Sequence, residues 1–418
     1  MKPRIGILSL GCPRNLVDSE SILTCLSKKG YEITDIDKAQ VALVNTCAFI
    51  KEAKQESIEV ILDLIDLKKQ GKIRKVIVYG CLSERYKGRL AKELPEVDAF
   101  LGRVSPDTGI ERFSLTPSHY AYLKICEGCI NQCSFCVIPR IKGRLVSLSE
   151  DSILNKAEEF DRRGIAELNI IGQDITGFGI DLNLSIGLCG LLKKIVRKAK
   201  HIEWIRLLYL NPERISEDLL MMIRDEDKIC KYIDLPIQHI NNRILRLMRR
   251  NISRDKIIRV INRIRKVIPN VALRTSIIVG FPGETDKEFD ELLKFIKDIQ
   301  FERLGAFRYS REEGTRACDF PRQVPESVKS DRFSQVMSSQ QEVSRGINRK
   351  FIGRKLKVLV DEYANGSYLG RTQFDAPEVD GLVYINSKGK LKPGNFVDLK
   401  ITDTLEYDLV GEVDNEFS

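Results

Sequence analysis

Residues 129–136 read Cys129-Ile-Asn-Gln-Cys133-Ser-Phe-Cys136, and the three cysteines follow one another with the spacing C-x3-C-x2-C. Three thiolates can bind three irons of a [4Fe-4S] cluster and leave the fourth iron without a protein ligand. An open metal position is typical of a catalytic site, because a substrate or a cofactor can bind there. The stretch therefore predicts a redox enzyme with a metal cluster in this loop.

Two simpler interpretations of the loop are weaker. A structural zinc site usually has four ligands in paired C-x2-C units, which this spacing does not provide. A fourth thiol, Cys126, lies close enough in the sequence to complete the cluster. Cys126 belongs to the strand expected before the loop, however, and is better explained as a small side chain packed in the core.

The size and composition of the chain predict a multidomain protein that does not cross a membrane. Its 418 residues are too many for one ordinary hydrophobic core. No apolar run approaches 18 residues, and the first ten residues resemble a strand more than a signal peptide. Without an export signal, the eleven cysteines are better explained as metal ligands or core residues than as disulfides, and we expect a cytoplasmic location.

The net charge is unevenly distributed along the chain. Of the total of +9, residues 351–418 contribute −4, with 8 Lys and Arg against 12 Asp and Glu. The first 350 residues therefore carry +13. This asymmetry predicts a basic body that lies close to nucleic acid and an acidic appendage that faces a different surface.

The first segment, residues 1–117, alternates short β-rich runs with helical patterns. Strands are expected at residues 5–10, 41–44 and 75–79, and helices at residues 18–29 and 53–69. This alternation predicts an α/β fold with a doubly wound parallel sheet that has helices on both faces.

Cys12, Cys47 and Cys81 each fall just beyond the end of one of these strands. The strands of a parallel sheet point the same way, so their carboxyl ends share one edge, where doubly wound sheets bind ligands. Three cysteines that are far apart in the sequence are thus expected to meet at one site. Cysteine is also a common core residue, but placement at three successive strand ends argues against that explanation. We interpret these cysteines as ligands of a second iron–sulfur cluster, again with an open iron.

The second segment, residues 118–347, repeats the strand–helix unit six times. Strands are expected at residues 121–125, 167–171, 204–208, 231–235, 273–279 and 303–309. Six successive right-handed units predict an open (β/α)6 barrel, with the Cys129 loop after its first strand at the catalytic end. Residues 323–350, which are rich in serine, glutamine and charged residues, are expected to form a long helical connector.

The last segment, residues 348–418, loses the helical period. Strands are expected at residues 357–361, 367–372, 382–385, 396–401 and 408–413. Five short strands with glycine-containing turns between some of them predict a small antiparallel β-barrel, which is often a binding module.

With these motifs the chain resembles the methylthiotransferases of the radical S-adenosylmethionine (SAM) superfamily over its whole length. That family combines an N-terminal domain with three cluster cysteines, a radical SAM barrel and a C-terminal TRAM β-barrel. The resemblance implies two [4Fe-4S] clusters and SAM as cofactors. It implies Cys129, Cys133 and Cys136 as ligands of the cluster that binds SAM, and the three cysteines of the first segment as ligands of an auxiliary cluster. It also points to Gln173 and Arg274, at strand ends, as SAM contacts.

Two local patterns resemble the branch of the family that modifies a ribosomal protein (RimO). Residues 9–13 read Ser-Leu-Gly-Cys-Pro, and Cys-Pro is characteristic of that branch, whereas the branch that modifies transfer RNA usually has Cys-Gln. Residues 375–381 read Asp-Ala-Pro-Glu-Val-Asp-Gly, which is similar to a run of the same branch. The resemblance implies methylthiolation of the β-carbon of an aspartate in small-subunit ribosomal protein number twelve. A SAM-derived 5′-deoxyadenosyl radical would activate that carbon, and the auxiliary cluster would deliver the sulfur.

The resemblance and the charge together imply partners. A module that grips RNA should be basic, so the acidic final domain is expected to dock the basic ribosomal protein. A low-potential electron donor such as flavodoxin or ferredoxin is expected. Ribosomal RNA is a further candidate partner, at the basic stretch of residues 243–266, for which a solvated helix face is the simpler explanation. Two other functions stay open: a tRNA adenosine (2-methylthio) methylthiotransferase, and a non-catalytic iron–sulfur electron carrier, which would not need a (β/α) barrel.

Overall fold

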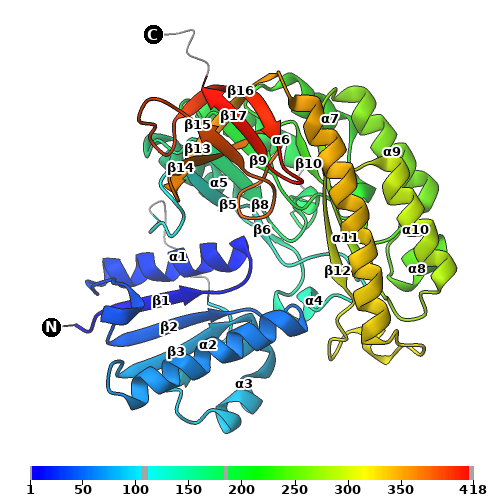
Figure 1. The fold of residues 1–418 in the computed structure, drawn as a ribbon. Helices are drawn as coiled ribbons and strands as arrows, with labels where there is room; N and C mark the ends of the chain where they lie inside the picture. The colour runs from blue at the N-terminus through cyan, green and yellow to red at the C-terminus, as the bar shows by residue number, and fades with distance from the viewer. Residues whose placement is uncertain (1, 105–111, 183–186, 414–418) are drawn as a thin grey trace.

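The computed structural model describes residues 2–104, 112–182 and 187–413 (Figure 1). Three parts follow one another: a parallel sheet covered by helices, a set of six parallel barrel strands, and a closed β-barrel. The predicted fold class is confirmed for each part, whereas the boundaries near residues 117 and 347 stay predictions. Within the described ranges, no helix has both the length and the apolar character needed to span a bilayer.

The first part is a sheet of parallel strands in the order β1-β2-β3-β4. Its elements are β1 (Ile5–Ser9), α1 (Pro13–Lys28), β2 (Val41–Thr46), α2 (Lys51–Lys69), β3 (Lys75–Gly80), α3 (Cys81–Glu93) and β4 (Ala99–Phe100). Ile33 pairs with Ile5 on the outer side of β1. The connection through α1 therefore leads from β1 to the outer edge of the sheet, whereas the connection through α2 leads from β2 in the opposite direction to β3.

Successive side chains of a strand point to opposite faces, which explains how both faces of this sheet are covered. Val44 of β2 packs with Ile61 and Leu64 of α2, whereas Leu43 packs with Leu26 of α1. Figure 1 shows α1 and α2 on opposite sides of the sheet. The sheet is therefore doubly wound, as predicted.

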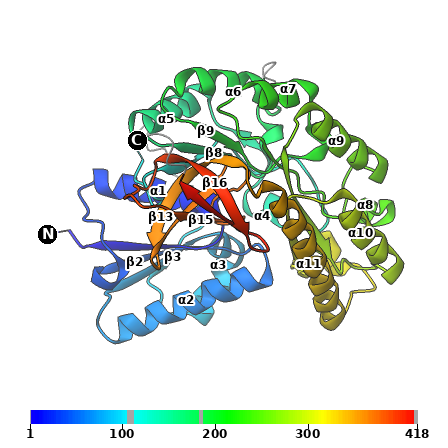
Figure 2. The same ribbon diagram turned by 45° about the horizontal axis from the view of Figure 1, so that its top comes forward.

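The second part has six parallel strands in two sheets, β5-β8-β9 and β10-β11-β12. A bridge between Ile205 and Ile229 links the two sheets. Figure 2 shows the helices of this part in an arc around the strands. The main elements are β5 (Tyr120–Lys124), α5 (Glu150–Arg162), β8 (Glu167–Ile171), α6 (Gly187–Lys198), β9 (Trp204–Leu207), α7 (Glu217–Asp225), β10 (Tyr232–Asp234), α8 (Asn242–Leu247), α9 (Arg254–Val267), β11 (Ala272–Val279), α10 (Asp286–Ile299) and β12 (Arg303–Arg308).

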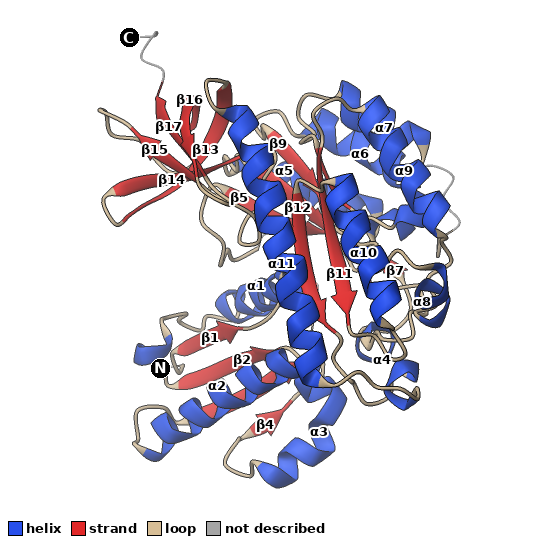
Figure 3. Ribbon diagram, turned by 45° about the vertical axis from the view of Figure 1, so that its right-hand side comes forward, coloured by secondary structure: helices blue, strands red, loops and turns tan. Residues whose placement is uncertain are grey.

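The expected connector after the last strand is helix α11 (Glu326–Asn348), and it is part of the barrel wall. It packs against β12 and α10, and its Val336 is buried in the same core as the strands (Figure 3). The prediction of a helix at this place is confirmed, but the helix also completes the last strand–helix unit. Its polar composition concealed this role, because only a narrow side of α11 carries apolar residues.

The third part is a closed barrel with the strand order β13-β14-β15-β17-β16. Its strands are β13 (Lys355–Ala364), β14 (Ser367–Thr372), β15 (Val383–Asn386), β16 (Phe396–Thr404) and β17 (Leu409–Val413). All pairs are antiparallel except β15 with β17, which are parallel. The chain crosses from β15 to β16 beside β13 before it returns, so β17 runs in the direction of β15.

Residues 371–380, which we call the closing segment, lie against the amino-terminal ends of the barrel strands. Each of the six strands contributes one residue that contacts it. These contacts are Tyr120 with Glu378, Glu167 with Arg371, Arg206 with the carbonyl of Gln373, Tyr232 and Arg274 with Asp380, and Arg303 with Asp375. The cysteine loop lies at the opposite ends of the strands, so the closing segment seals the barrel at the end away from the candidate site.

The closing segment corrects the charge prediction for the third part. Asp375 and Asp380 of the acidic run are only 2% and 3% exposed, because they pair with arginines of the barrel. Among the described residues 351–413, more cations than anions are therefore exposed. The exposed cations are Arg354, Lys355, Lys357, Lys388, Lys390, Lys392 and Lys400, and the exposed anions are Glu362, Glu378, Asp398, Asp403 and Glu412. In the described residues of the third part, the acidic run therefore adds little negative charge to the surface.

Candidate iron–sulfur sites

The cysteine loop of residues 129–136 runs from β6 (Cys126–Glu127) to α4 (Ile138–Ile141). Its backbone is held at both ends, since the N–H of Cys129 donates to the carbonyl of Gly143 at 3.3 Å and that of Cys136 donates to Cys133 at 3.2 Å. The sulfur of Cys129 accepts hydrogen bonds from the backbone and side-chain amides of Asn131, at 3.4 and 3.2 Å. These hydrogen bonds define the shape of the loop around the three cysteines.

Electrostatics at this loop favour a positively charged ligand. Burial raises the pKa of Cys136 to about 12, and the neighbouring Cys133 and Cys129 sulfurs add to the effect. Burial also raises the pKa of Cys129. Three thiolates in one place repel each other, so they lose their protons together only when a metal centre supplies compensating charge. The fit to an iron–sulfur cluster therefore rests on the spacing and placement of the three cysteines, because burial raises the pKa of ligand and non-ligand thiols alike.

The second group of cysteines lies at the carboxyl edge of the first sheet. Cys12 caps the start of α1, Cys47 follows β2, and Cys81 begins α3. Gly11 has φ +88°, and a Cβ at this position would lie 2.7 Å from the Cβ of Cys47 and 2.9 Å from its sulfur. The absence of a side chain at residue 11 lets the sulfur of Cys47 lie against the chain beside Cys12. The Cys81 thiol donates to Asn15 at 3.6 Å.

The pKa values of the thiols in this second group are shifted in different directions. Burial would raise the pKa of Cys12, but the guanidinium of Arg14, with help from the backbone of Asn15 and from Lys142, lowers it below its ordinary value. Burial raises the pKa of Cys47 and raises that of Cys81 to about 12. One thiolate is therefore favoured in advance, and the other two need a metal centre to lose their protons.

Neither group is arranged to bind a single metal ion. In the three described ranges, no three Cys, His, Asp or Glu side chains converge on one point as the ligands of one ion would. In a [4Fe-4S] cluster each thiolate binds a different iron, so the sulfurs stand further apart than the ligands of one ion. The argument against a structural zinc ion is the cysteine spacing, which lacks the paired C-x2-C units of zinc sites.

The other residues singled out in the sequence occupy three different environments. Gln173 follows β8; its amide donates to Glu127 at 3.0 Å, and its buried oxygen has no hydrogen-bond partner in the described structure. Arg274 is already paired with Asp234 at 3.1 Å and with Asp380 at 3.3 Å. A SAM contact through Gln173 therefore has a free acceptor in its favour, whereas the role of Arg274 stays a prediction without such support.

Cys126 packs inside the barrel. It is fully buried in the apolar core, and its thiol donates weakly to the carbonyl of Asp174 at 3.8 Å. Burial raises its pKa to about 12. These surroundings suit a packed neutral thiol better than a fourth ligand.

Cations that the sequence analysis did not assign lie between the two cysteine groups. The ammonium of Lys142 contacts Asp18 at 3.0 Å and Glu127 at 3.2 Å, so it joins α1 to the barrel. A guanidinium nitrogen of Arg250 lies 3.9 Å from the sulfur of Cys133. Arg14 follows Cys12 by two residues, and this closeness in the sequence could have identified it as a residue of the site. Arg250 lies more than 100 residues from the loop, so nothing local indicated its role.

Comparisons with known proteins agree with this architecture. The sequence model of the Radical SAM superfamily matches residues 123–296, that of Uncharacterized protein family UPF0004 matches residues 4–102, and that of the TRAM domain matches residues 352–413. The three matches follow the order of the three structural parts, and they cover both cysteine groups.

Solved structures share the fold at low sequence identity. The radical SAM methyltransferase TsrM from Kitasatospora setae is similar over 74% of this chain and 75% of its own, with a TM-score of 0.53 and 14% identity. The cobalamin-dependent SAM radical enzyme OxsB is similar over 82% of this chain and 56% of its own, with a TM-score of 0.51 and 12% identity. The arrangement of the parts is therefore that of radical SAM enzymes.

Curated relatives match at much higher identity. Proteins named ribosomal protein uS12 methylthiotransferase RimO from Thermoanaerobacter sp. (strain X514) and from Geobacter sulfurreducens are 45% and 44% identical to the chain. The first match covers 98% of this chain and 99% of the relative, and the second covers 99% of each. The chain belongs to the RimO family of radical SAM methylthiotransferases.

Proposed function

We propose that the protein transfers a methylthio group to the β-carbon of an aspartate in ribosomal protein uS12. The observation that carries the proposal is the full-length match to relatives named for this activity, combined with two groups of three cysteines at strand ends that face each other. An electron-carrier function is disfavoured, because a carrier does not need the barrel or the second open site.

We assign Cys129, Cys133 and Cys136 to the cluster that binds SAM, and Cys12, Cys47 and Cys81 to the auxiliary cluster. When bound, the first cluster and SAM supply a radical that can break an unactivated C–H bond, and the second cluster supplies sulfur. The residues around them shape the site. Asn131 donates hydrogen bonds to a ligand sulfur, and Gln173 offers its free oxygen to a hydroxyl group of SAM.

The substrate aspartate would enter between the first sheet and the open end of the barrel. Two ion pairs join these parts on one side of the entrance, where Lys54 and Arg85 both contact Glu312 at 2.7 Å. The closing segment seals the other end of the barrel, so reactants and solvent reach the interior from the cysteine side. This arrangement supports a site from which water is excluded once the substrate is bound.

The uS12 assignment does not rest on an acidic docking surface. Among residues 351–413 of the β-barrel more cations than anions are exposed, and docking through the buried acidic run is not part of the proposal. The same correction removes the charge argument against an RNA substrate, which leaves sequence identity to the uS12 enzymes as the evidence for the branch. An electron donor such as flavodoxin or ferredoxin and a cytoplasmic location complete the proposal.

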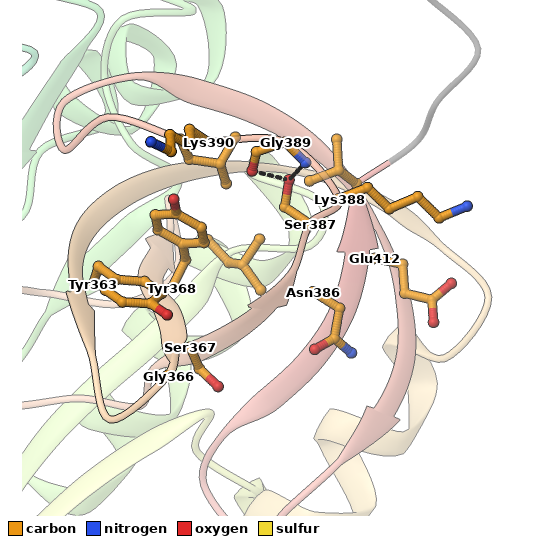
Figure 4. Close-up of a pocket in the computed structure, with 13 residues that line it drawn as sticks. Tyr363, Gly366, Ser367, Tyr368, Asn386, Ser387, Lys388, Gly389, Lys390 and Glu412 are labelled. Carbon is orange, nitrogen blue, oxygen red and sulfur yellow. Dashed lines mark hydrogen bonds between the residues drawn. The ribbon is translucent and has the colours of Figure 1, made fainter.

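A groove on the β-barrel supports a contact with ribosomal RNA near the substrate. Figure 4 shows Tyr363 and Tyr368 next to each other on the left, Lys390 above them, and Lys388 on the right with its ammonium pointing away from the rings. The cavity measures about 830 Å³, and the tyrosine rings lie 4.8 Å apart. Exposed aromatic rings beside lysines suit an unpaired base and its phosphate. The basic stretch of residues 243–266 offers less, because several of its arginines are paired with glutamates.

The RNA contact has its own test. Tyr363→Ala combined with Lys390→Ala should weaken the binding of a single-stranded ribosomal RNA oligonucleotide by about tenfold or more, the worth of one stacked base. Lys69→Ala, a loss of an exposed lysine in the first part, should leave binding unchanged. Equal affinities of all three proteins would remove the groove from the proposal.

The reaction is tested by anaerobic turnover of the reconstituted protein with SAM, dithionite and a peptide that spans the target aspartate of uS12. Mass spectrometry should detect a methylthio adduct on that aspartate. A tRNA anticodon stem-loop in a parallel reaction tests the alternative substrate, and modification of the stem-loop alone would replace the uS12 assignment. Absence of SAM cleavage, with both clusters present, would refute the enzyme function.

The cysteine assignment is tested by two triple alanine variants. Replacement of Cys129, Cys133 and Cys136 should abolish SAM cleavage. Replacement of the three cysteines of the first part should leave SAM cleavage intact and abolish methylthio transfer. If the second variant still forms the product, those cysteines do not bind the sulfur-delivering cluster.

A further inference from the structure

Arg14 connects the two cysteine groups through the chain itself. It lies in the first turn of α1, two residues after Cys12. Its Nη1 donates to the carbonyl of Gly172 at 2.8 Å, just after β8 of the barrel. Its guanidinium lies 4.4 Å from the ring centroid of Tyr209, just after β9. One side chain thus ties the chain beside Cys12 to the ends of two barrel strands.

The backbone of Tyr209, whose ring stacks against the guanidinium of Arg14, is held by hydrogen bonds to neighbouring segments. Its φ is +65°, a conformation that is strained for a residue with a side chain and persists only where the surroundings enforce it. The backbone N–H of Tyr209 donates to the carboxylate of Asp234 at 2.9 Å, and its carbonyl accepts from the N–H of Ile175 at 3.1 Å. These bonds fix the ring independently of Arg14.

The charge of Arg14 is directed at sulfur. In the described part of the chain, no carboxylate lies within ion-pair distance of its guanidinium, which lies in the turn that follows Cys12. A guanidinium is planar and keeps its charge, so it can stack on a ring and donate in its own plane at the same time. Lysine has no such plane.

We propose that Arg14, seated on Tyr209, is a positioning residue that sets the placement of the auxiliary cluster site relative to the SAM site. The inference rests on the proposed function, since it takes both cysteine groups as cluster sites. Sulfur transfer requires both sites to reach one substrate carbon, and a displacement of about 1 Å can reduce such a step about 100-fold. A cation beside Cys12 also favours the reduced, more negative state of the auxiliary cluster.

The test compares Arg14→Gln, Arg14→Lys and Tyr209→Leu with the wild-type holoprotein. Electron paramagnetic resonance of the doubly reduced protein measures the magnetic interaction between the two clusters, without any turnover. We expect full iron content in all variants and a weaker interaction in each. Product formed per SAM cleaved should fall about 100-fold in Arg14→Gln. Arg14→Lys should restore the auxiliary cluster's potential, which falls in Arg14→Gln, without restoring the interaction.

Two further arginines of the first part provide controls. Arg85→Gln removes another buried bond to the barrel, the one to Glu312, and Arg89→Gln removes only an exposed pair with Glu93. Both should keep the interaction of the wild type. An unchanged interaction and product ratio in Arg14→Gln would overturn the inference, as would an equal loss in Arg85→Gln. If Arg14→Gln fails to bind the auxiliary cluster, Tyr209→Leu decides, because it leaves every residue beside Cys12 in place.

Failure of the proposed function can be told apart from failure of the inference. A wild-type protein that cleaves SAM but modifies neither substrate would refute the function. The magnetic interaction would still report on Arg14, since it requires only the two clusters. A wild-type protein that binds one cluster would refute both.

Discussion

The buried ion pairs of Glu167 hold the third part of the protein on the barrel, and Glu167→Gln should release it. Glu167 is fully buried, with Arg206 at 2.7 Å on one oxygen and Arg371 at 2.7 Å on the other. Burial disfavours its charge, but the two guanidiniums lower its pKa below the ordinary value. The exchange keeps the shape of the side chain and removes the only carboxylate that Arg206 contacts in the described structure.

The expected loss of stability follows from the contacts that Arg206 and Arg371 keep in the variant. Arg371 keeps its contacts with Asp361, whereas Arg206 keeps neutral partners alone: the amide oxygen of the new glutamine, backbone carbonyls of the closing segment and the ring of Tyr232. A buried charge without its counter-ion destabilises a protein by about 3–5 kcal/mol. Glu203 pairs with Lys357 across the same two parts, but both side chains are about half exposed. Its loss should cost at most about 1 kcal/mol, and Glu203→Gln is the matched control.

The assay uses the single tryptophan of the chain. Trp204 lies at this interface, with its ring 4.8 Å from that of Phe396 in an edge-to-face contact. Its fluorescence in a urea titration should therefore report separation of the two parts, while far-ultraviolet circular dichroism reports global unfolding. For Glu167→Gln the fluorescence transition should move to much lower urea. A midpoint no lower than that of Glu203→Gln would show that the buried pair does not hold the interface.

Three further predictions concern the candidate sites. Lys124 and Lys142 lower the pKa of Glu127 below its ordinary value of 4.5 against the effect of burial, so its ion pairs stabilise the fold above pH 4.5 and this stabilisation is lost as the pH falls below that value. Glu127→Gln should flatten the dependence of the unfolding free energy on pH across that window. Gly11→Ala should abolish iron binding at the first sheet by displacing Cys47, whereas Gly71→Ala, at φ +76° in open space, should not; equal iron contents would refute this. Asn131→Ala removes the side-chain hydrogen bond to a ligand sulfur, and a redox titration should find a more negative potential.

Most of the fold could be predicted from the sequence because its strands are short apolar runs between clear breaks. The predicted bounds of β8 and β14 agree with the structure, and those of the other predicted strands differ by three residues or fewer, whereas the two-residue strands β4, β6 and β7 were not predicted. Helix α1 was predicted to begin at residue 18 but begins at Pro13, because proline fits the first turn of a helix and does not interrupt it there. Local sequence patterns thus predicted the positions of these strands well but predicted the start of helix α1 poorly.

The candidate sites could be predicted only where the order of strands and helices along the chain determines which residues come together. Parallel strands bring Cys12, Cys47 and Cys81 to one edge, which topology alone implies. The partners of Arg274 and of the acidic run could not be predicted, because they come from segments 40 to 258 residues away. Net charge was misleading for the same reason, since the sequence does not reveal which carboxylates are buried.

The position of the closing segment near the end of the chain has a consequence for biosynthesis. Arg303 of the last barrel strand finds its carboxylate partner in Asp375, which is translated much later. A nascent chain that has completed all six strands still exposes hydrated guanidiniums at the amino-terminal ends of the strands. We therefore expect the amino-terminal ends of the barrel strands to pack fully only after the closing segment has been translated.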